Sequence, residues 1–305
     1  MDEGRNTNDN IIYTENGKEL IFAEETARLK SDVDVYKWRL QPKNEKLRGI
    51  LFFAHGYAEH SRCRDEFVRL LCAELNIIVI SHDYVGHGRS KGERVYIDTF
   101  DTFVEDILCH VDEFNALHPD LPVYLFGHSM GGALTILTAC SRPNFFKAVV
   151  LSSPAIVIDP SIEPGCVKVF VGRIINRLTP RFQILPKIDT NVLSKDPKEV
   201  EAYDSDPLIW HSGMKVRFAI AFGDALDRIK LLLPSIEWPF LVVHGDEDKI
   251  TYKGGSELLA KEAKSKDKEI KIYKGLRHAM LGEVKEEADA VVEHILEWLR
   301  NRIPS

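Results

Sequence analysis

Residues 121–137, LPVYLFGHSMGGALTIL, place a serine between an apolar run and a helical pattern. The run 122–126 contains β-branched and aromatic residues, which is typical of a buried strand. Residues 127–131 fit G-x-S-x-G, and good helix formers follow from Ala133. A serine on so sharp a turn stands clear of the sheet, beside free helix N–H groups that favour developing negative charge. The pattern predicts a nucleophile at Ser129; the alternative is a small-residue turn that only packs a helix on the sheet.

Further apolar runs alternate with helical patterns on both sides of this stretch. We expect strands over 49–54, 77–81, 148–152, 238–245 and 269–273, and helices over 65–75, 100–116 and 286–300. Runs that are apolar throughout are typical of strands buried on both faces of a parallel sheet. Residues 11–48 alternate loosely, which predicts a hairpin at the sheet edge. The sequence therefore predicts an α/β fold with a mostly parallel central sheet flanked by helices.

The alternation of strands and helices stops near Pro154. Prolines recur between residues 155 and 234, and apolar strand runs are missing there. This composition predicts a helical insertion. We therefore expect residues 1–154 and 235–305 to form the two parts of one core, with residues 155–234 as a helical cap or lid.

The overall composition narrows the class of partner. The 305 residues carry a formal net charge of −7, which argues against nucleic acid as a partner. No apolar run approaches the length of a membrane span. Residues 1–10 are polar and lack the apolar core of a secretory signal. The five cysteines are scattered without a C-x-x-C pair, as expected of free thiols in a reducing compartment. We therefore expect a cytoplasmic location, and nothing in the sequence calls for a cofactor.

A serine hydroxyl becomes a strong nucleophile when a histidine, oriented by a carboxylate, removes its proton. In an open parallel sheet such groups collect beyond the carboxyl ends of strands. Acidic residues follow the strand expected at 238–245, namely Asp246, Glu247 and Asp248. Asp248 lies far enough along the loop to reach a histidine, whereas Asp246 is better placed to cap the turn. His278 follows the last expected strand. Ser129, Asp248 and His278 thus form the predicted triad.

The negative charge of a tetrahedral intermediate is stabilised by backbone N–H donors. One predicted donor is Met130, which follows the nucleophile, and the other is Tyr57, in the turn after an early strand. Gly56 lets this turn come close. His55 and His60 could bind a metal in principle, but no third ligand lies at supporting spacing. We therefore expect these two histidines to fix the loop by hydrogen bonds, and we expect no metal.

Two further histidines lie near the predicted triad in the sequence. His128 precedes the nucleophile, and its side chain should point away from that of Ser129. His244 lies in the strand before the acid. We expect both to be packed structural residues.

Residues 167–182 combine an apolar stripe with basic residues. The stripe has helical spacing and consists of Val167, Phe170, Val171, Ile174, Ile175 and Leu178. Between residues 167 and 188 there are basic side chains at 168, 173, 177, 181 and 187, and no acid. One interpretation is a cap helix that packs its apolar stripe on the core and solvates its basic face. The other is a lid that rests on an anionic membrane, and both hold if the lid opens.

Several motifs together resemble those of a known family. They are His55-Gly56-x-x-Glu59-His60, Asp83-x-x-Gly86-His87-Gly88-x-Ser90 and Gly127-His128-Ser129-Met130-Gly131-Gly132. They resemble the monoacylglycerol lipases, which are serine hydrolases of the α/β-hydrolase fold. Two stretches of the insertion are similar to that family's cap: Ile188-Asp189-x-x-Val192-Leu193-Ser194 and Tyr203-x-Ser205-Asp206-Pro207-Leu208-Ile209. The likeness covers nearly the whole chain from about Val33.

The resemblance implies an α/β-hydrolase fold whose helical cap opens an apolar acyl tunnel to the membrane. It implies hydrolysis of monoacylglycerols to glycerol and free fatty acid, and it supports the predicted triad and oxyanion donors. It also places Glu59 and Tyr203 near the glycerol pocket. The sequence departs from the family at Tyr57, where a small residue is usual, and at Thr251, where vertebrate members carry a cysteine.

The sequence leaves other functions open. A lysophospholipase or general carboxylesterase would use the same triad. A non-catalytic binding protein of the α/β-hydrolase fold would usually lack a triad member, whereas all three candidates are present here. The expected partners are a monoacylglycerol or similar lipid ester, and a membrane surface that the cap contacts transiently.

Overall fold

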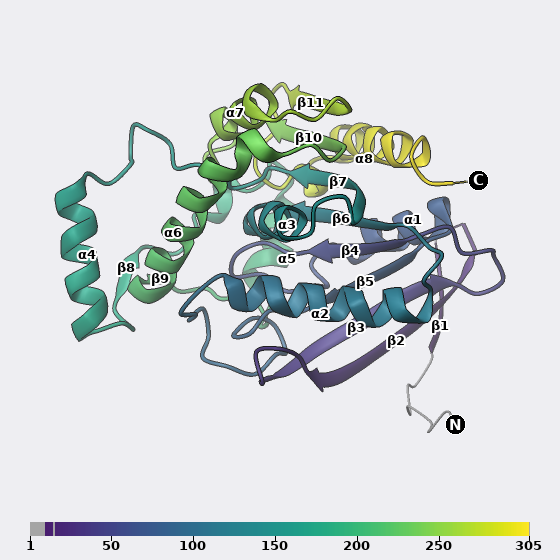
Figure 1. Ribbon diagram of the computed structural model, residues 1–305, viewed down its shortest axis with the longest axis horizontal. Helices are drawn as coiled ribbons and strands as arrows, with labels where there is room; N and C mark the ends of the chain where they lie inside the picture. The colour runs from purple at the N-terminus through teal and green to yellow at the C-terminus, as the bar shows by residue number, and fades with distance from the viewer. Residues whose placement is uncertain (1–9, 15, 305) are drawn as a thin grey trace.

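The computed structural model describes residues 10–14 and 16–304 (Figure 1). In this part of the chain, nine strands form one sheet in the order β1-β2-β3-β5-β4-β6-β7-β10-β11. The strands are β1 (Asn10–Tyr13), β2 (Glu19–Arg28), β3 (Asp34–Pro42), β4 (Ile50–Ala54), β5 (Ile78–His82), β6 (Val123–His128), β7 (Phe146–Ser152), β10 (Phe240–Gly245) and β11 (Lys268–Tyr273). Pairing is antiparallel from β1 to β5 and parallel from β5 to β11. The prediction of a mostly parallel sheet with an edge hairpin is confirmed.

Helices cover both faces of this sheet (Figure 1). They include α1 (Asp65–Leu75), α2 (Asp101–Leu117), α3 (Met130–Ser141), α6 (Val216–Leu232), α7 (Lys253–Glu262) and α8 (Lys285–Arg300). Strand β4 shows why its sequence is apolar throughout. Phe52 packs in the cluster that contains residues of α2, α3 and α6, whereas Leu51 and Phe53 pack in the cluster of α1 and α8. Each buried side chain of this size stabilises the fold by about 1.5–3 kcal/mol.

Residues 155–234, which we call the inserted segment, separate two adjacent strands of the sheet, β7 and β10. Besides α6 they form α4 (Cys166–Leu178), β8 (Gln183–Leu185), η1 (Thr190–Val192), α5 (Pro197–Ser205), β9 (Met214–Lys215) and the start of η2 (Leu233–Ser235). Helices make up most of the regular structure of this segment. Strands β8 and β9, which pair antiparallel, were not predicted because they are too short to show a period in the sequence.

Several composition-based expectations can be compared with the structure. Cys63, Cys72, Cys109 and Cys140 are free thiols, as expected, while the side chain of Cys166 lies outside the described part of the chain. Nearly all of the polar N-terminal stretch, residues 1–9, also lies outside it. Of the helices in the described ranges, none has the length and apolar content that a membrane span needs.

Candidate active site

Ser129 lies on a strained turn between β6 and α3. Its φ and ψ are 55° and −121°, a region that residues with a side chain rarely adopt. A Cβ atom on Gly131 would collide with the carbonyl oxygen of Ala54, so only glycine lets the turn lie against β4. The Ser129 N–H donates to the carbonyl of Ser152, at the end of β7, over 3.0 Å. The turn therefore holds Ser129 at the carboxyl edge of the sheet.

Asp248 and His278 lie on the loops after β10 and β11. His278 Nδ1 is 2.7 Å from Asp248 Oδ2, and the side chains are 4% and 0% exposed. Asp248 Oδ1 accepts the N–H groups of Ile250 and Thr251 over 2.7 and 3.0 Å. Burial by itself would raise the pKa of Asp248, but His278 and His244 outweigh it and hold that pKa far below its ordinary value. The ionised Asp248 therefore keeps the proton of His278 on Nδ1, so that Nε2 can accept another.

The serine and the histidine are connected through one short segment after β7. Ser152 accepts the Ser129 N–H, and the hydroxyl of Ser153 donates to the carbonyl of His278 over 2.9 Å. The ring of His128, next to the serine, lies 4.9 Å from the ring of His278. The structure thus brings the turn of Ser129 and the loop of His278 together.

His128 is buried and contacts a backbone carbonyl, as expected for a packed residue. Its Nδ1 donates to the carbonyl of Ser152 over 3.2 Å. Burial lowers its pKa well below the ordinary range, with the nearby His278 adding to the effect. His128 is therefore a neutral neighbour of the site.

The turn after β4 lies against Ser129. A Cβ atom on Gly56 would be 3.4 Å from Ser129 Cβ. Glu59 Oε2 accepts the Gly56 N–H over 3.1 Å. His55 Nδ1 donates to the carbonyl of Gly56 over 2.9 Å, and its Nε2 accepts the N–H of Tyr84 over 3.2 Å. The prediction that His55 fixes this loop by hydrogen bonds is confirmed.

The same prediction for His60 is confirmed, because its Nε2 lies 2.8 Å from Asp206 Oδ2 on the inserted segment. Within the described ranges, no three or more His, Cys, Asp or Glu side chains form a group that could hold a metal ion.

The two predicted oxyanion donors differ in surroundings. Met130 is fully buried and is the first residue of α3, where backbone N–H groups have no partner within the helix. Tyr57 packs its ring 5.2 Å from that of Phe218, and its hydroxyl is buried without a hydrogen-bond partner among the described residues. Burial raises the pKa of the Tyr57 hydroxyl, so this group stays neutral.

Glu59 and Tyr203 are both buried on the side of the inserted segment. Tyr203 packs in a small cluster with Leu193, Ile209 and Ala279, and Ala279 is the neighbour of the triad histidine in the chain. Burial raises the pKa of Tyr203, and the negative charge of Glu59 raises it further. Tyr203 therefore packs beside the loop after β11, and the charge of Glu59 acts on its hydroxyl.

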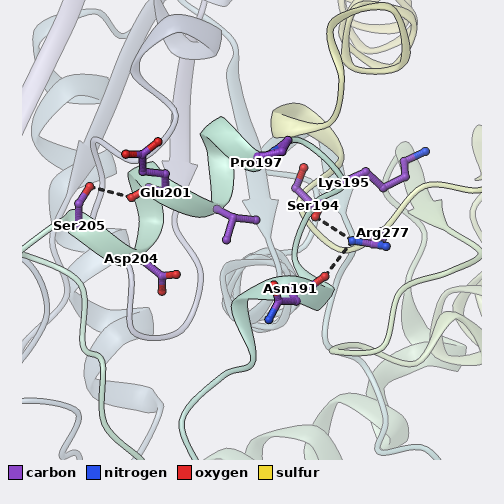
Figure 2. Close-up of a pocket in the computed structure, with 9 residues that line it drawn as sticks. Asn191, Ser194, Lys195, Pro197, Glu201, Asp204, Ser205 and Arg277 are labelled. Carbon is purple, nitrogen blue, oxygen red and sulfur yellow. Dashed lines mark hydrogen bonds between the residues drawn. The ribbon is translucent and has the colours of Figure 1, made fainter.

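Arg277, the other neighbour of His278, attaches this loop to the inserted segment. Figure 2 shows its guanidinium group donating to the carbonyls of Asn191 and Ser194, over 2.8 and 2.9 Å. The Ala279 N–H donates to the carbonyl of Leu193 over 2.8 Å. A surface cavity of about 740 Å³ lies between residues 191–205 and Arg277. The inserted segment thus contacts both neighbours of His278, the side chain of Arg277 and the backbone of Ala279.

Two polar contacts of the site were not predicted. Thr251 Oγ1 is 2.8 Å from Asp248 Oδ2, and His244 Nε2 is 3.2 Å from the same oxygen. His244 is fully buried, as expected for a packed residue, but it also contacts Asp248, the predicted acid. The available signal was its position at the carboxyl end of β10, four residues before Asp248.

A serine on a strand–turn–helix elbow, with a buried acid and histidine on later loops at the same sheet edge, defines an α/β-hydrolase. Residues 45–285 match the family described as Hydrolase_4, serine aminopeptidase, S33. Monoglyceride lipase of Homo sapiens is 41% identical over 255 residues, which are 84% of this chain and 83% of the human protein. The chain belongs to this family of hydrolases, among the monoglyceride lipases.

Other relatives agree with this assignment. The monoacylglycerol lipase of Mycolicibacterium smegmatis is 34% identical over 83% of this chain and 88% of its own length. The crystal structure of Paleococcus ferrophilus monoacylglycerol lipase superposes with a TM-score of 0.76 at 29% identity, over 88% of this chain and 99% of that one. The resemblance seen in the sequence motifs is confirmed.

Proposed function

We propose that this protein hydrolyses monoacylglycerols to glycerol and free fatty acid. Ser129 attacks the ester carbonyl while His278 Nε2 takes the hydroxyl proton, and the N–H groups of Met130 and Tyr57 bind the oxyanion. His278 then gives the proton to the glycerol oxygen, and water repeats the cycle on the acyl-enzyme. The buried 2.7 Å contact between His278 and Asp248 carries the chemistry, and the named activity of the 41% identical human relative supports the substrate.

We place the glycerol end of the substrate beside Glu59 and Tyr203. Glu59 holds the Gly56 turn through Oε2, so a glycerol hydroxyl bound to this carboxylate would lie next to Ser129. Tyr203 packs beside the loop of His278, where the leaving alcohol takes its proton.

We assign residues 155–234 as a cap on a core made of residues 1–154 and 235–305. The inserted segment separates adjacent strands of one sheet, and it contacts the loop of His278 through Arg277 and Ala279. A change in the position of this segment would therefore reach the catalytic base.

A substrate panel tests the proposed reaction. It would contain monoacylglycerols of several chain lengths, lysophospholipids and triacylglycerol, assayed with the natural chain and with Ser129→Ala. We expect monoacylglycerol to be cleaved fastest, and Ser129→Ala to lose at least about 10³-fold in kcat. Faster cleavage of lysophospholipid would favour the lysophospholipase alternative. No labelling of Ser129 by a fluorophosphonate probe would favour the non-catalytic binding protein.

Helix α4 supports the proposed peripheral contact with a membrane. Val167, Phe170 and Leu178 are 71%, 64% and 74% exposed, so the apolar stripe does not pack on the core. Basic residues share this helix, and Arg173 pairs with Asp224 at its exposed surface. An exposed apolar stripe with flanking cations is the arrangement that binds an anionic lipid surface.

Sedimentation with anionic liposomes tests this contact. We expect binding that weakens with salt, and that falls when Lys168, Arg173 and Arg177 are changed to Glu. The control changes the net charge equally at the exposed residues Lys261, Lys264 and Lys266. Equal sedimentation of both triple variants would remove the proposal.

A further inference from the structure

The carboxylate of Asp248 is surrounded by more donors than His278 alone. Asp248 Oδ2 lies 2.7 Å from His278 Nδ1, 2.8 Å from Thr251 Oγ1 and 3.2 Å from His244 Nε2. The hydroxyl of Thr251 has a single proton, and the carbonyl of Ser153 lies within 3.0 Å of it as a competing acceptor. Besides His278, His244 therefore supplies a second donor from outside the loop of Asp248.

The direction of the hydrogen bond from His244 follows from its partners. His244 Nε2 faces the Asp248 carboxylate and, at 3.3 Å, the carbonyl of Thr251, and both groups can only accept. The hydroxyl of Thr251 lies 3.4 Å from Nε2, but it has closer acceptors in Asp248 Oδ2 and the carbonyl of Ser153. Nε2 must therefore carry a proton. His244 Nδ1 lies 2.8 Å from Ser256 Oγ on α7, so the serine hydroxyl can donate to it and fix this tautomer. His244 and Ser256 are both fully buried, so water does not compete for these contacts.

We propose that His244 is a positioning residue for the reaction, a second imidazole that holds the Asp248 carboxylate in the orientation in which it binds His278. The inference rests on the proposed function and concerns the acid of that site. A buried carboxylate that loses a donor is solvated less well and becomes a stronger base. Without His244, Asp248 would rotate toward its remaining donors or hold the His278 proton more tightly.

Two substitutions separate the hydrogen bond from the packing. His244→Gln keeps a side-chain N–H for Asp248 and an acceptor for Ser256, whereas His244→Leu fills the space without either. We expect His244→Leu to lower kcat by about 10-fold or more with little change in KM, yet by less than the roughly 10⁴-fold seen when a triad acid is altered. We expect His244→Gln to recover most of this loss.

The control is His110→Leu, which replaces another imidazole that is buried and lies in α2, paired with His82. It measures the general effect of losing a buried histidine, and we expect kcat per folded molecule to stay as in the natural chain. Ser256→Ala removes only the group that orients His244, and we expect a smaller loss of kcat than for His244→Leu.

Two measurements would not change if His244 had a purely structural role. Besides Asp248, the ionisable side chains near this cluster are His278, the neutral His128 of β6 and Arg64, whose charge acts on His128. A purely structural role of His244 would leave the acid limb of the kcat/KM profile unchanged. We expect His244→Leu to move that limb to higher pH by roughly half a unit or more, because the less solvated carboxylate stabilises the charged imidazole. In the free protein, we expect the low-field proton resonance of the His278–Asp248 hydrogen bond to shift or vanish in His244→Leu and to persist in His244→Gln.

These readouts distinguish failure of this inference from failure of the proposed function. Cleavage of a p-nitrophenyl ester without cleavage of monoacylglycerol would contradict the substrate assignment. The p-nitrophenyl ester would still give kcat values for the His244 variants. The resonance requires no activity at all. An unchanged kcat, pH limb and resonance in His244→Leu would overturn the inference, as would equal losses in the Gln and Leu variants. If His244→Leu does not fold, kcat, the pH limb and the resonance are measured in His244→Gln and Ser256→Ala. Comparison of these values with those of the natural chain then decides whether His244 positions Asp248.

Discussion

At the scale of single residues, Ser129 shows how the site stores strain. Its φ of 55° and ψ of −121° suit glycine, yet the proposed reaction needs a hydroxyl there. The positions on either side of it have no room for a side chain, since a Cβ atom at Gly127 or Gly131 would collide with a backbone carbonyl. The nucleophile is therefore held by its neighbours rather than by its own preference.

We expect this strain to appear in the stability of two inactive variants. Ser129→Ala keeps the Cβ atom and hence the strain of about 1–3 kcal/mol, whereas Ser129→Gly removes it at an entropic cost of about 0.5–1 kcal/mol. The free energy of unfolding, measured in urea, should therefore be about 1 kcal/mol larger for Ser129→Gly. A larger value for Ser129→Ala would contradict the strain argument.

At the scale of elements, the loop after β11 depends on a buried carboxylate. Glu283 is 3% exposed and follows η3 (Met280–Gly282). Its Oε1 accepts the N–H of Arg277 over 2.7 Å, and its Oε2 accepts the N–H of Lys195, in the inserted segment, over 2.8 Å. One side chain thus joins the loop of His278 to the inserted segment.

We expect Glu283→Ala to lower both stability and kcat. Two partly buried N–H groups lose their acceptor, at up to about 1–3 kcal/mol each, and the backbone beside His278 becomes free to move. Thermal unfolding and kcat on a p-nitrophenyl ester would measure the two effects. The control is Glu286→Ala, because Glu286 is exposed on the first turn of α8. Identical behaviour of the two variants would argue against the connecting role of Glu283.

At the scale of the whole molecule, buried histidines lie on both sides of β4 and near the site. Burial is the main reason that the pKa is lowered at His55, His82, His87, His110 and His128, for His87 to about 3. The folded protein therefore keeps these rings neutral at a pH where the unfolded chain would protonate them, below its ordinary value near 6.5.

This difference between the folded and unfolded chain determines how stability changes with pH. Below about pH 6.5 the unfolded chain binds more protons than the folded protein, so stability is complete above that pH and is lost as the pH falls. By about pH 5, each such histidine lowers the free energy of unfolding by about 2 kcal/mol. The sum over these histidines is comparable with the stability of a typical domain. We expect the urea midpoint to fall steeply between about pH 6.5 and 5.

The distant pair His82 and His110 provides the check. Its Nδ1 atoms lie 3.3 Å apart, away from the residues of the triad. Replacing both with Leu should reduce the slope of the unfolding free energy against pH. The reduction is at most about 2.7 kcal/mol per pH unit, which corresponds to two protons. An unchanged slope would show that the acid sensitivity comes from other groups.

Much of the fold could be predicted from the sequence because burial on both faces of the sheet recurs in several strands along the chain. Strands β4, β5, β6 and β10 are buried throughout, so each one is a largely apolar run whose ends are visible in the sequence. Ser129 and Asp248 follow such runs, whereas His278 follows the more exposed β11, and the order of the three residues in the chain restricts the choice to a few candidates. Asp248 could be preferred over Asp246 by loop length, and in the structure Asp246 Oδ1 accepts the N–H of Gly275 instead.

The sequence by itself determined the strands of the main sheet, the elbow and the loops on which Asp248 and His278 lie, because these depend on local pattern. Only the tertiary structure decided that His244 and Thr251 share the Asp248 carboxylate and that Glu283 joins the inserted segment to the loop of His278. It also decided that the apolar stripe of α4 is left exposed. A pattern shows which side chains lie on one face, but the partner of that face is set by how distant parts of the chain pack.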